Sequence, residues 1–358
     1  MNESDINDND LLAIFLLSEK NKYNNFNFKK ILIKKSGDTK IQIFYGINKN
    51  NKNDVILFKC INIDEKYIQN EYYPILKECK LLVYFKNYDY FPKNVQFLLS
   101  ENEEYLFIIF KENNTNLNVL INSKVDYLNN KDLIKWIIYQ IAFALYILHS
   151  NNIIHHDIKP SNILINAEGG ISICDFGSSI LKGEDSYQFT LPYAPPELLI
   201  DLTTKKDEKL DMWSLGVIIV ELHLKKTPIF RNDKVNDRNL QLQYLFSKLG
   251  IKENYSEEIL KKELNDNKKI IFNIEELISD HIKDPDAIDL IKNLITFSPR
   301  NRYNAKQVLE SDYLKEFRGL DSLDIKKVEN PINYKDLKDN TIDKKEFIEL
   351  IKKIIIEK

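Results

Sequence analysis

The sequence has few cysteines and few glycines for its length. Cys60, Cys79 and Cys174 are the three cysteines among 358 residues, and none belongs to a CxxC pair, so a disulfide framework is excluded and a reducing compartment is expected. The nine glycines form no Gly/Ser-rich linker that would divide the chain. No apolar run approaches the ~18 residues that a membrane-spanning helix needs, so we expect no membrane association.

An excess of either charge is also missing. Lysine and arginine number 51 against 54 aspartates and glutamates, which gives a net charge of −3 and disfavours a nucleic-acid binder, whose surface would be basic. The N-terminal residues lack the pattern of a signal peptide, so we expect a cytoplasmic and/or nuclear protein. With 43% hydrophobic residues the chain can form a sizeable core, and its length suggests about two lobes.

The first third of the chain is patterned for strands. Between about 24 and 110, β-branched and aromatic runs alternate with polar turns. These runs are Ile31–Ile33, Ile41–Tyr45, Val55–Ile61, Val95–Leu99 and Tyr105–Phe110. One helix is predicted among them, over Ile75–Val83, because Pro74 suits the first turn of a helix.

Beyond about residue 117 the apolar period becomes helical. Apolar residues at steps of three and four predict a helix with one buried face: Leu133, Trp136, Ile137, Ile141, Ala144, Leu145 and Leu148. Further helices are predicted over 211–224, 239–249, 286–297 and 304–315, the last with capping-box spacing at Asn304 and Gln307. Strands followed by helices indicate an α+β fold with a small strand-rich N-terminal lobe and a larger helical C-terminal lobe.

We place segment boundaries at 1–22, 23–113, 114–318 and 319–358. The first segment is expected to be a mobile tail with a small docking helix over Leu11–Leu17. The last ends in a helix that Asp343 and Glu346 can cap. Its apolar face consists of Phe347, Leu350, Ile351, Ile354 and Ile355. We predict that this amphipathic helix packs on the main body; the alternative is a free helix that binds a partner.

Charged and polar residues cluster in the middle of the chain. Asp157, Lys159 and Asn162 lie in the stretch His155–Asn162, and Asp175 follows 18 residues after Asp157. They flank a predicted strand–turn–strand over Ile163–Ile165 and Ile171–Cys174. Phosphoryl transfer needs such a set: a carboxylate to orient and deprotonate a hydroxyl, oxygen ligands for Mg²⁺, and a lysine to steady charge on the transferred group.

The stretch from Leu148 to Leu164, followed by Asp175-Phe176-Gly177, resembles the catalytic loop and the magnesium-binding motif of the eukaryotic protein kinase family. The resemblance covers nearly the whole chain and implies a bilobal protein-kinase fold, with ATP and Mg²⁺ as cofactors. It implies that Asp157 is the catalytic base and Lys159 the phosphate-contacting lysine of the Ser/Thr branch. Asn162 and Asp175 would be the magnesium ligands.

The resemblance extends to residues of the nucleotide site. Ile56–Lys59 is similar to the strand that presents a lysine to the α- and β-phosphates. Glu78 fits best as the ion-pair partner of Lys59, with Glu71 as the second choice. Phe110 would be the gatekeeper, with Lys111 and Asn113 bounding the hinge that faces adenine. Ile43 and Leu164 are the remaining residues assigned to nucleotide binding.

Other motifs follow in the family's order. Pro195-Pro196-Glu197 resembles the Ala-Pro-Glu motif, with Arg302 as salt-bridge partner of its glutamate, and Asp211–Gly216 resembles the helix that anchors the catalytic loop. Phe230–Leu249 resembles the segment that follows the anchoring helix in cyclin-dependent and mitogen-activated kinases. Ile295–Arg302 and the tail helix after Tyr334 are most similar to the mitogen-activated branch. Within the activation loop, Tyr187 falls at the tyrosine of that branch's Thr-x-Tyr switch, Asp185 replaces the threonine, and Thr190 matches the threonine that bonds the catalytic loop.

The sequence departs from the family around the phosphates. Ser36, Asp38 and Ile41 stand where the loop's glycines should be, and only Gly37 is present, one place away. Leu57 replaces the small residue over adenine. His156 and Ala194 replace arginines that read activation-loop phosphates, so we predict that phosphorylation of this loop is not the main switch.

The function that this pattern predicts is an ATP-dependent serine/threonine protein kinase, a divergent member similar to mitogen-activated kinases. The alternative is a pseudokinase, a kinase-shaped scaffold with little or no turnover. We expect a monomer that acts on protein substrates, and basic docking peptides are a further class of partner if Asp321 and Asp324 form an acidic patch rather than a solvated turn. The adjacent His155 and His156 could suggest a metal, but neighbouring side chains point apart, and we predict that His155 is buried behind Phe176.

Overall fold

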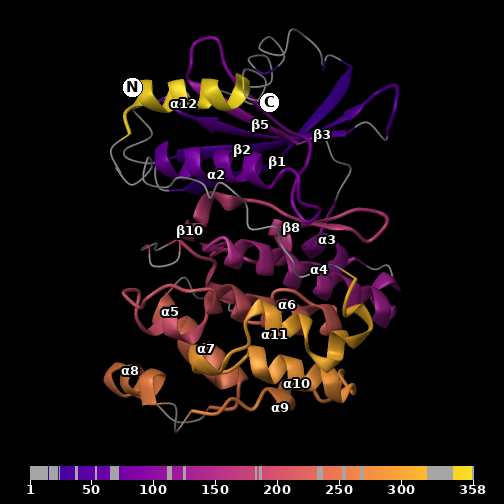
Figure 1. Ribbon diagram of the computed structural model, residues 1–358, viewed down its shortest axis with the longest axis vertical. Coiled ribbons are helices and arrows are strands. Elements are labelled where there is room, and N and C mark those ends of the chain that lie inside the picture. Colours follow the sequence, from indigo (N-terminus) through magenta and orange to yellow (C-terminus); the bar gives the residue numbers. More distant parts are fainter. Residues whose placement is uncertain are drawn as a thin grey trace. The chain divides into compact units, whose positions relative to one another are not determined.

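The computed structural model of the chain describes residues 15, 23, 25–36, 39–52, 55–64, 72–110, 115–123, 126–181, 184, 188–231, 237–251, 255–266, 270–320 and 342–356 (Figure 1). These residues form two compact units. The first unit holds the described residues up to 110 together with 342–356, and the second unit holds 115–320.

The first unit is built on an antiparallel five-stranded sheet with the strand order β1-β2-β3-β5-β4. Its strands are β1 (Phe26–Ser36), β2 (Thr39–Asn48), β3 (Val55–Asn62), β4 (Val95–Leu99) and β5 (Tyr105–Phe110). Each predicted strand run is confirmed. Strand β1 is longer than predicted because it pairs with β2 from Phe26 opposite Asn48 to Ser36 opposite Thr39.

Two helices complete the first unit (Figure 1). Helix α2 (Tyr72–Phe85) has Pro74 in its first turn, as predicted. Helix α12 (Lys344–Ile356) packs on α2, where the rings of Tyr72 and Phe347 lie 4.9 Å apart between centroids. The Asp343 carboxylate accepts a hydrogen bond of 2.8 Å from the backbone N–H of Glu346, which caps α12. The predicted accessory helix, packed on the main body, is therefore confirmed.

One face of the sheet carries an aromatic cluster. Phe58 of β3 is fully buried there, and its ring stacks on that of Phe44 at 4.9 Å and on that of Phe15 at 4.1 Å. Of the predicted docking helix Leu11–Leu17, Phe15 alone lies among the described residues; its backbone is helical and its side chain is fully buried. The predicted docking is thus confirmed at this residue, whereas the predicted mobile tail lies outside the described residues.

The second unit contains most of the helices. They are α3 (Leu117–Asn122), α4 (Lys131–Ser150), α5 (Pro196–Ile200), α6 (Lys209–Leu224), α7 (Arg238–Lys248), α8 (Glu257–Asp266), α9 (Ile274–Ile278), α10 (Pro285–Leu294) and α11 (Ala305–Leu309). Short 3₁₀ turns cover Asp126–Asn129, Pro160–Asn162, Phe176–Ser178, Leu191–Tyr193, Pro299–Asn301 and Asp312–Phe317. The observed α+β organisation, a sheet-based unit followed by a helical one, is the fold class predicted from the sequence.

Small sheets in the second unit frame the catalytic stretch. β6 (Thr115–Asn116), β8 (Ile163–Ile165) and β9 (Ile171–Ile173) form an antiparallel sheet in the order β6-β8-β9. β7 (Ile153–Ile154) pairs with β10 (Ile180–Leu181). The predicted strand–turn–strand after Asn162 is therefore confirmed.

Helices α4 and α6 form the core of the second unit. Every residue of α6 from Leu210 to Leu222 is buried, which is why it is apolar on all sides rather than along one stripe. Among the described residues, α4 alone is long and apolar enough to cross a membrane by length and composition. In the folded protein, 67% of the most apolar 18-residue stretch of α4 is buried, as is typical of a core helix.

Two predicted helices end earlier than expected. The helix predicted over 304–315 is wrong beyond Leu309, because Ser311 begins a 3₁₀ turn and its hydroxyl donates to the carbonyl of Val308. The predicted capping box between Asn304 and Gln307 is confirmed. The helix predicted to reach 297 ends at Leu294, since the buried residues that follow it extend the apolar pattern without helical backbone.

Helices α8 and α9 were not predicted. Their stretch is rich in charge, and α8 buries only Leu260 and Glu263 among its described side chains, so the apolar period that marks a helix is weak.

Candidate active site

A buried carboxylate holds the backbone of the predicted catalytic loop. Asp211 lies in the first turn of α6, and its two oxygens each accept a 2.8 Å hydrogen bond from the backbone N–H groups of His155 and His156. The ring of His149, on α4, lies 2.9 Å from the same carboxylate. Burial alone would raise the pKa of Asp211, but these hydrogen bonds and the nearby histidines lower it, so the carboxylate stays charged.

His156 occupies a strained backbone position. Its φ of 66° lies in the left-handed region, which costs a non-glycine residue free energy. The two hydrogen bonds from this residue and its neighbour to Asp211 offset that strain and turn the chain sharply. Asp157 follows the turn directly.

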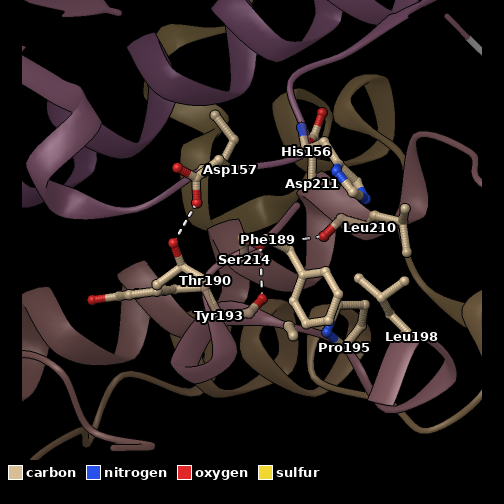
Figure 2. A pocket seen from close by; sticks show the side chains of 12 residues that line it. His156, Asp157, Phe189, Thr190, Tyr193, Pro195, Leu198, Leu210, Asp211 and Ser214 are labelled. Carbon is tan, nitrogen blue, oxygen red and sulfur yellow. Dashed lines mark hydrogen bonds between the residues drawn. The ribbon is translucent and has the colours of Figure 1, made fainter. Parts of the chain in front are cut away.

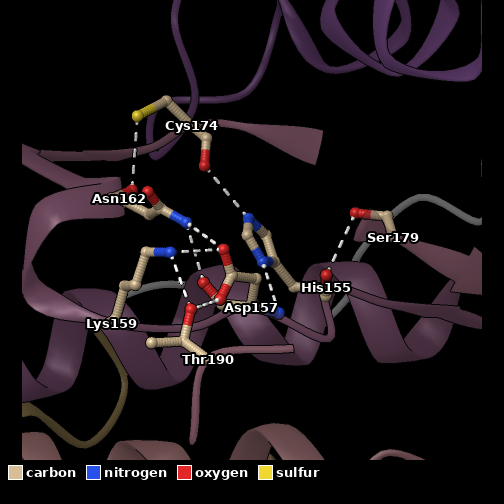
Figure 3. A network of polar contacts seen from close by, with 7 residues as sticks. All are labelled: His155, Asp157, Lys159, Asn162, Cys174, Ser179 and Thr190. Carbon is tan, nitrogen blue, oxygen red and sulfur yellow. Dashed lines mark hydrogen bonds and ion pairs between the residues drawn. The ribbon is translucent and has the colours of Figure 1, made fainter. Parts of the chain in front are cut away.

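The side chains beyond the turn form a closed polar network (Figure 3). The ammonium of Lys159 donates to Asp157 Oδ2 at 2.6 Å and to the hydroxyl of Thr190 at 2.9 Å. Thr190 in turn donates to Asp157 Oδ1 at 2.5 Å. Asn162 donates its amide to the carbonyl and to Oδ2 of Asp157, at 2.9 and 3.1 Å. The structure therefore brings together all of the catalytic-loop residues that the sequence predicted, with Thr190 of the activation loop.

The second predicted magnesium ligand follows β9. The backbone N–H of Cys174 donates to the carbonyl of Asn162 at 3.0 Å, so the chain entering Asp175 is tied to the catalytic loop. Asp175 has a left-handed backbone, with φ of 65°. The ring of the fully buried His155 lies 5.3 Å from that of Phe176, which confirms the predicted position of His155.

In the first unit, Lys59 and Glu78 form a bidentate ion pair. The ammonium of Lys59 on β3 lies 2.9 and 2.7 Å from the two carboxylate oxygens of Glu78 on α2. Only 8% of Lys59 and 2% of Glu78 is exposed, so neither charge has much water to solvate it. The predicted choice of Glu78 is confirmed, and Glu71 lies outside the described residues.

Comparison with known proteins agrees with this geometry. Residues 34–314 match the family described as protein kinase domain. The chain belongs to the protein kinase family. Its curated relatives include mitogen-activated protein kinases 10 and 6 of Arabidopsis thaliana, each 32% identical, and extracellular signal-regulated kinase 2 of Dictyostelium discoideum, 28% identical. The predicted resemblance to the mitogen-activated group is therefore confirmed.

These alignments are partial on both sides. They cover 64%, 69% and 63% of this kinase, in that order, and 58%, 62% and 63% of the relatives. The kinase thus spans about three fifths of the length of the relatives that it matches.

Three residues assigned to nucleotide binding, Lys59, Ile43 and Phe110, share one face of the kinase's large sheet with Leu57. Paired residues of an antiparallel sheet, and residues two apart on a strand, point to the same side. Ile43 pairs with Lys59, Leu57 lies two residues before Lys59, and Phe110 pairs with Leu57. Ile43, Leu57 and Phe110 are half-buried. This shared face is the one that α2 reaches through Glu78.

The remaining predicted residues belong to the second unit or lie outside the described residues. Leu164 is half-buried on β8 in the second unit of the kinase. Lys111, Asn113 and Tyr187 lie outside the described residues, as do Asp321 and Asp324 of the predicted docking patch. The described residues contain no group of three or more metal-ligating side chains, so the histidine pair has no partner set for a transition metal.

The predicted salt bridge between Glu197 and Arg302 is confirmed. The guanidinium donates to the two carboxylate oxygens at 2.7 and 3.1 Å, and 1% of Arg302 is exposed. Its Nη atoms also donate to the carbonyls of Lys209 and Thr296, and the guanidinium lies over the ring of Trp213 at 5.1 Å. This pairing fixes the end of the activation segment to the core of the kinase.

Sequence reasoning missed a second buried carboxylate in α6. Glu221 accepts hydrogen bonds from Thr227 at 2.8 Å, from the backbone of Ile229 at 3.0 Å and from the phenol of Tyr193 at 3.2 Å. Burial raises the pKa of Glu221 to about 8. The available signal was one acidic residue inside an otherwise apolar helix, a position at which a charge needs partners.

Proposed function

We propose that this kinase is an active serine/threonine protein kinase, which transfers the γ-phosphate of MgATP to hydroxyl groups of protein substrates. The observation that carries the proposal is the network in which Lys159, Thr190 and Asn162 converge on the carboxylate of Asp157. A scaffold without phosphotransfer would not require these three side chains to converge on the carboxylate of Asp157.

Asp157 is suited to the role of base. Its carboxylate is held by hydrogen bonds from three side chains, so it can orient a substrate hydroxyl and accept its proton. Lys159 contacts both Asp157 and Thr190, which places its ammonium beside the carboxylate that would receive the proton and suits it to steady charge on the transferred phosphate.

Asn162 and Asp175 have the chemistry of magnesium ligands. The amide nitrogen of Asn162 is committed to Asp157, which orients the amide and leaves its oxygen for a cation. Carboxylate and amide oxygens are hard ligands of the kind that Mg²⁺ prefers. When bound, Mg²⁺ would neutralise charge on the phosphates, and the Lys59–Glu78 pair would present the lysine to the α- and β-phosphates.

The test is phosphotransfer onto a peptide array by wild-type protein and by the Asp157→Asn variant. We expect the variant to lose activity by about 10²–10⁴-fold, the range for removal of a general base. The matched control is Asp289→Asn, a change of the same kind outside the catalytic loop, which should leave the rate within about twofold. Equal activity of wild type and Asp157→Asn would remove the proposal.

The second candidate function is a scaffold. It is favoured by the β1–β2 hairpin, whose strands stay paired to Ser36 and Thr39, and whose sequence lacks the glycines that let backbone N–H groups approach phosphates. Leu57 adds bulk on the sheet face of Lys59. Titration with MgATP that leaves the melting temperature unchanged, together with phosphotransfer no higher than in Asp157→Asn, would favour the scaffold.

A further inference from the structure

A small pocket lies behind the catalytic loop (Figure 2). Its walls include His156, Asp157, Phe189, Pro195, Leu198 and Leu210. The cavity that remains measures about 10 Å³, the room of a single water molecule at most. The pocket is therefore nearly filled by the protein's own side chains.

His156 adds no positive charge to this pocket. Only 6% of the residue is exposed, so water hardly solvates its ring. Burial lowers the pKa of His156, with a smaller lowering by Lys206, although Asp211, Asp157 and the backbone of Gln188 act in the opposite direction. The imidazole is neutral at pH 7, so the pocket offers no cation to an incoming phosphate.

Phe189 packs against this neutral imidazole. The two rings meet edge to face, with centroids 6.4 Å apart and planes inclined by 76°. Phe189 immediately precedes Thr190, whose hydroxyl bonds Asp157 and Lys159. Because one peptide bond separates the ring from that hydroxyl's residue, the position of the ring constrains where the hydroxyl can lie.

We propose that Phe189 is a positioning residue, an apolar anchor that packs against His156 and so holds Thr190 on Asp157 without any phosphate on the activation loop. The inference rests on the proposed kinase activity and adds to it the device that keeps the site assembled. Apolar contact, unlike an arginine–phosphate pair, needs no modification to form, so the arrangement persists in the unmodified protein.

The kinetic test uses phosphatase-treated protein and the variants Phe189→Ala and Phe189→Leu. We expect Phe189→Ala to lower kcat at least tenfold with the KM for ATP within twofold, and Phe189→Leu to restore at least a third of wild-type kcat. Phe317→Ala removes a half-buried ring elsewhere in the same unit and should leave kcat within twofold. A tenfold fall in wild-type activity on phosphatase treatment would overturn the proposal, as would equal losses in Phe189→Ala and Phe317→Ala.

A second readout needs no activity. The chain has five histidines, and the ring proton signals of His156 can be assigned by comparison with a His156→Gln variant. Loss of the Phe189 ring should expose the imidazole and raise its titration midpoint toward the ordinary value, whereas Phe317→Ala should not move it. An unchanged midpoint in Phe189→Ala would refute the anchor. A raised midpoint in a protein without phosphotransfer would support the anchor and refute the proposed activity.

Discussion

The ring of Phe15 stacks on the ring of Phe58 with 4.1 Å between centroids. Phe58 directly precedes Lys59, the lysine that pairs with Glu78. Successive side chains of a strand point to opposite faces of a sheet, so Phe58 and Lys59 lie back to back on β3. Phe15 therefore covers the side of β3 opposite to Lys59. A residue outside the kinase motifs thus contributes to the environment of a motif residue.

Replacing Phe15 by alanine should destabilise the first unit. The ring is fully buried in the aromatic cluster, and removal of a buried phenylalanine typically costs about 3–5 kcal/mol. Phe15→Leu keeps most of the apolar volume and should cost less than half as much. Urea unfolding followed by circular dichroism measures both changes. Equal stability of Phe15→Ala and wild type would show that the docked segment adds nothing.

The Lys59–Glu78 pair should separate stability from function. Breaking a buried ion pair by removal of one partner is strongly destabilising, so Lys59→Met should cost about 3–5 kcal/mol of unfolding free energy. The double variant Lys59→Met/Glu78→Leu, which buries no charge, should recover most of that loss. We expect MgATP to raise the melting temperature of the wild type and of neither variant. Recovery of the MgATP effect in the double variant would contradict the role of Lys59 in nucleotide binding.

Asp211 should be essential for the shape of the catalytic loop. In Asp211→Asn one side-chain oxygen becomes a donor, so a backbone N–H of His155 or His156 loses its acceptor. A buried unsatisfied donor costs about 1–3 kcal/mol, and the loop that bears Asp157 should shift with it. We expect phosphotransfer to fall at least tenfold and unfolding to occur at lower urea. The exposed-residue control Asp132→Asn should change neither, and a wild-type rate in Asp211→Asn would disprove the assignment.

Glu221 should make the protein less stable as the pH rises from about 4.5 to about 8. Burial raises its pKa from the ordinary 4.5 to about 8, so the folded protein keeps a proton that the unfolded chain has released. The stability that this neutral carboxyl contributes is complete below about pH 4.5 and is lost as the pH rises through about 8. Glu221→Gln keeps hydrogen-bonding capacity without a titrating proton. Its unfolding free energy should therefore fall less than that of the wild type between pH 6 and 9 in urea titrations.

The control for this pH series is Glu310→Gln, which removes an exposed carboxylate. Its stability should follow the wild-type curve across the whole range. Parallel curves for Glu221→Gln and wild type would mean that Glu221 is already charged at pH 6.

Several features of the fold and the site were predictable because they are local. The polar–apolar alternation of β2 to β5 can be recognised within each short strand. The spacing of Asp157, Lys159 and Asn162 likewise spans only a few residues. The partner of Lys59 could be narrowed to Glu78 because few acids lie on the helix that follows β3. The overlong helix at 304–315 shows the limit of this reading: apolar residues at helical spacing continue past Ser311, although the helix does not.

By itself, then, the sequence determined the order of strands and helices and the spacing of Asp157, Lys159 and Asn162 that resembles a kinase catalytic loop, since both lie in short-range patterns of the chain. Only the tertiary structure decided that Phe15 covers Phe58, that Asp211 holds a loop more than 50 residues before it, and that Phe189 packs on His156. No regular spacing in the sequence identifies these pairs of residues as contacts. Their energy comes from burial and from paired charges, which exist only once the segments have packed together.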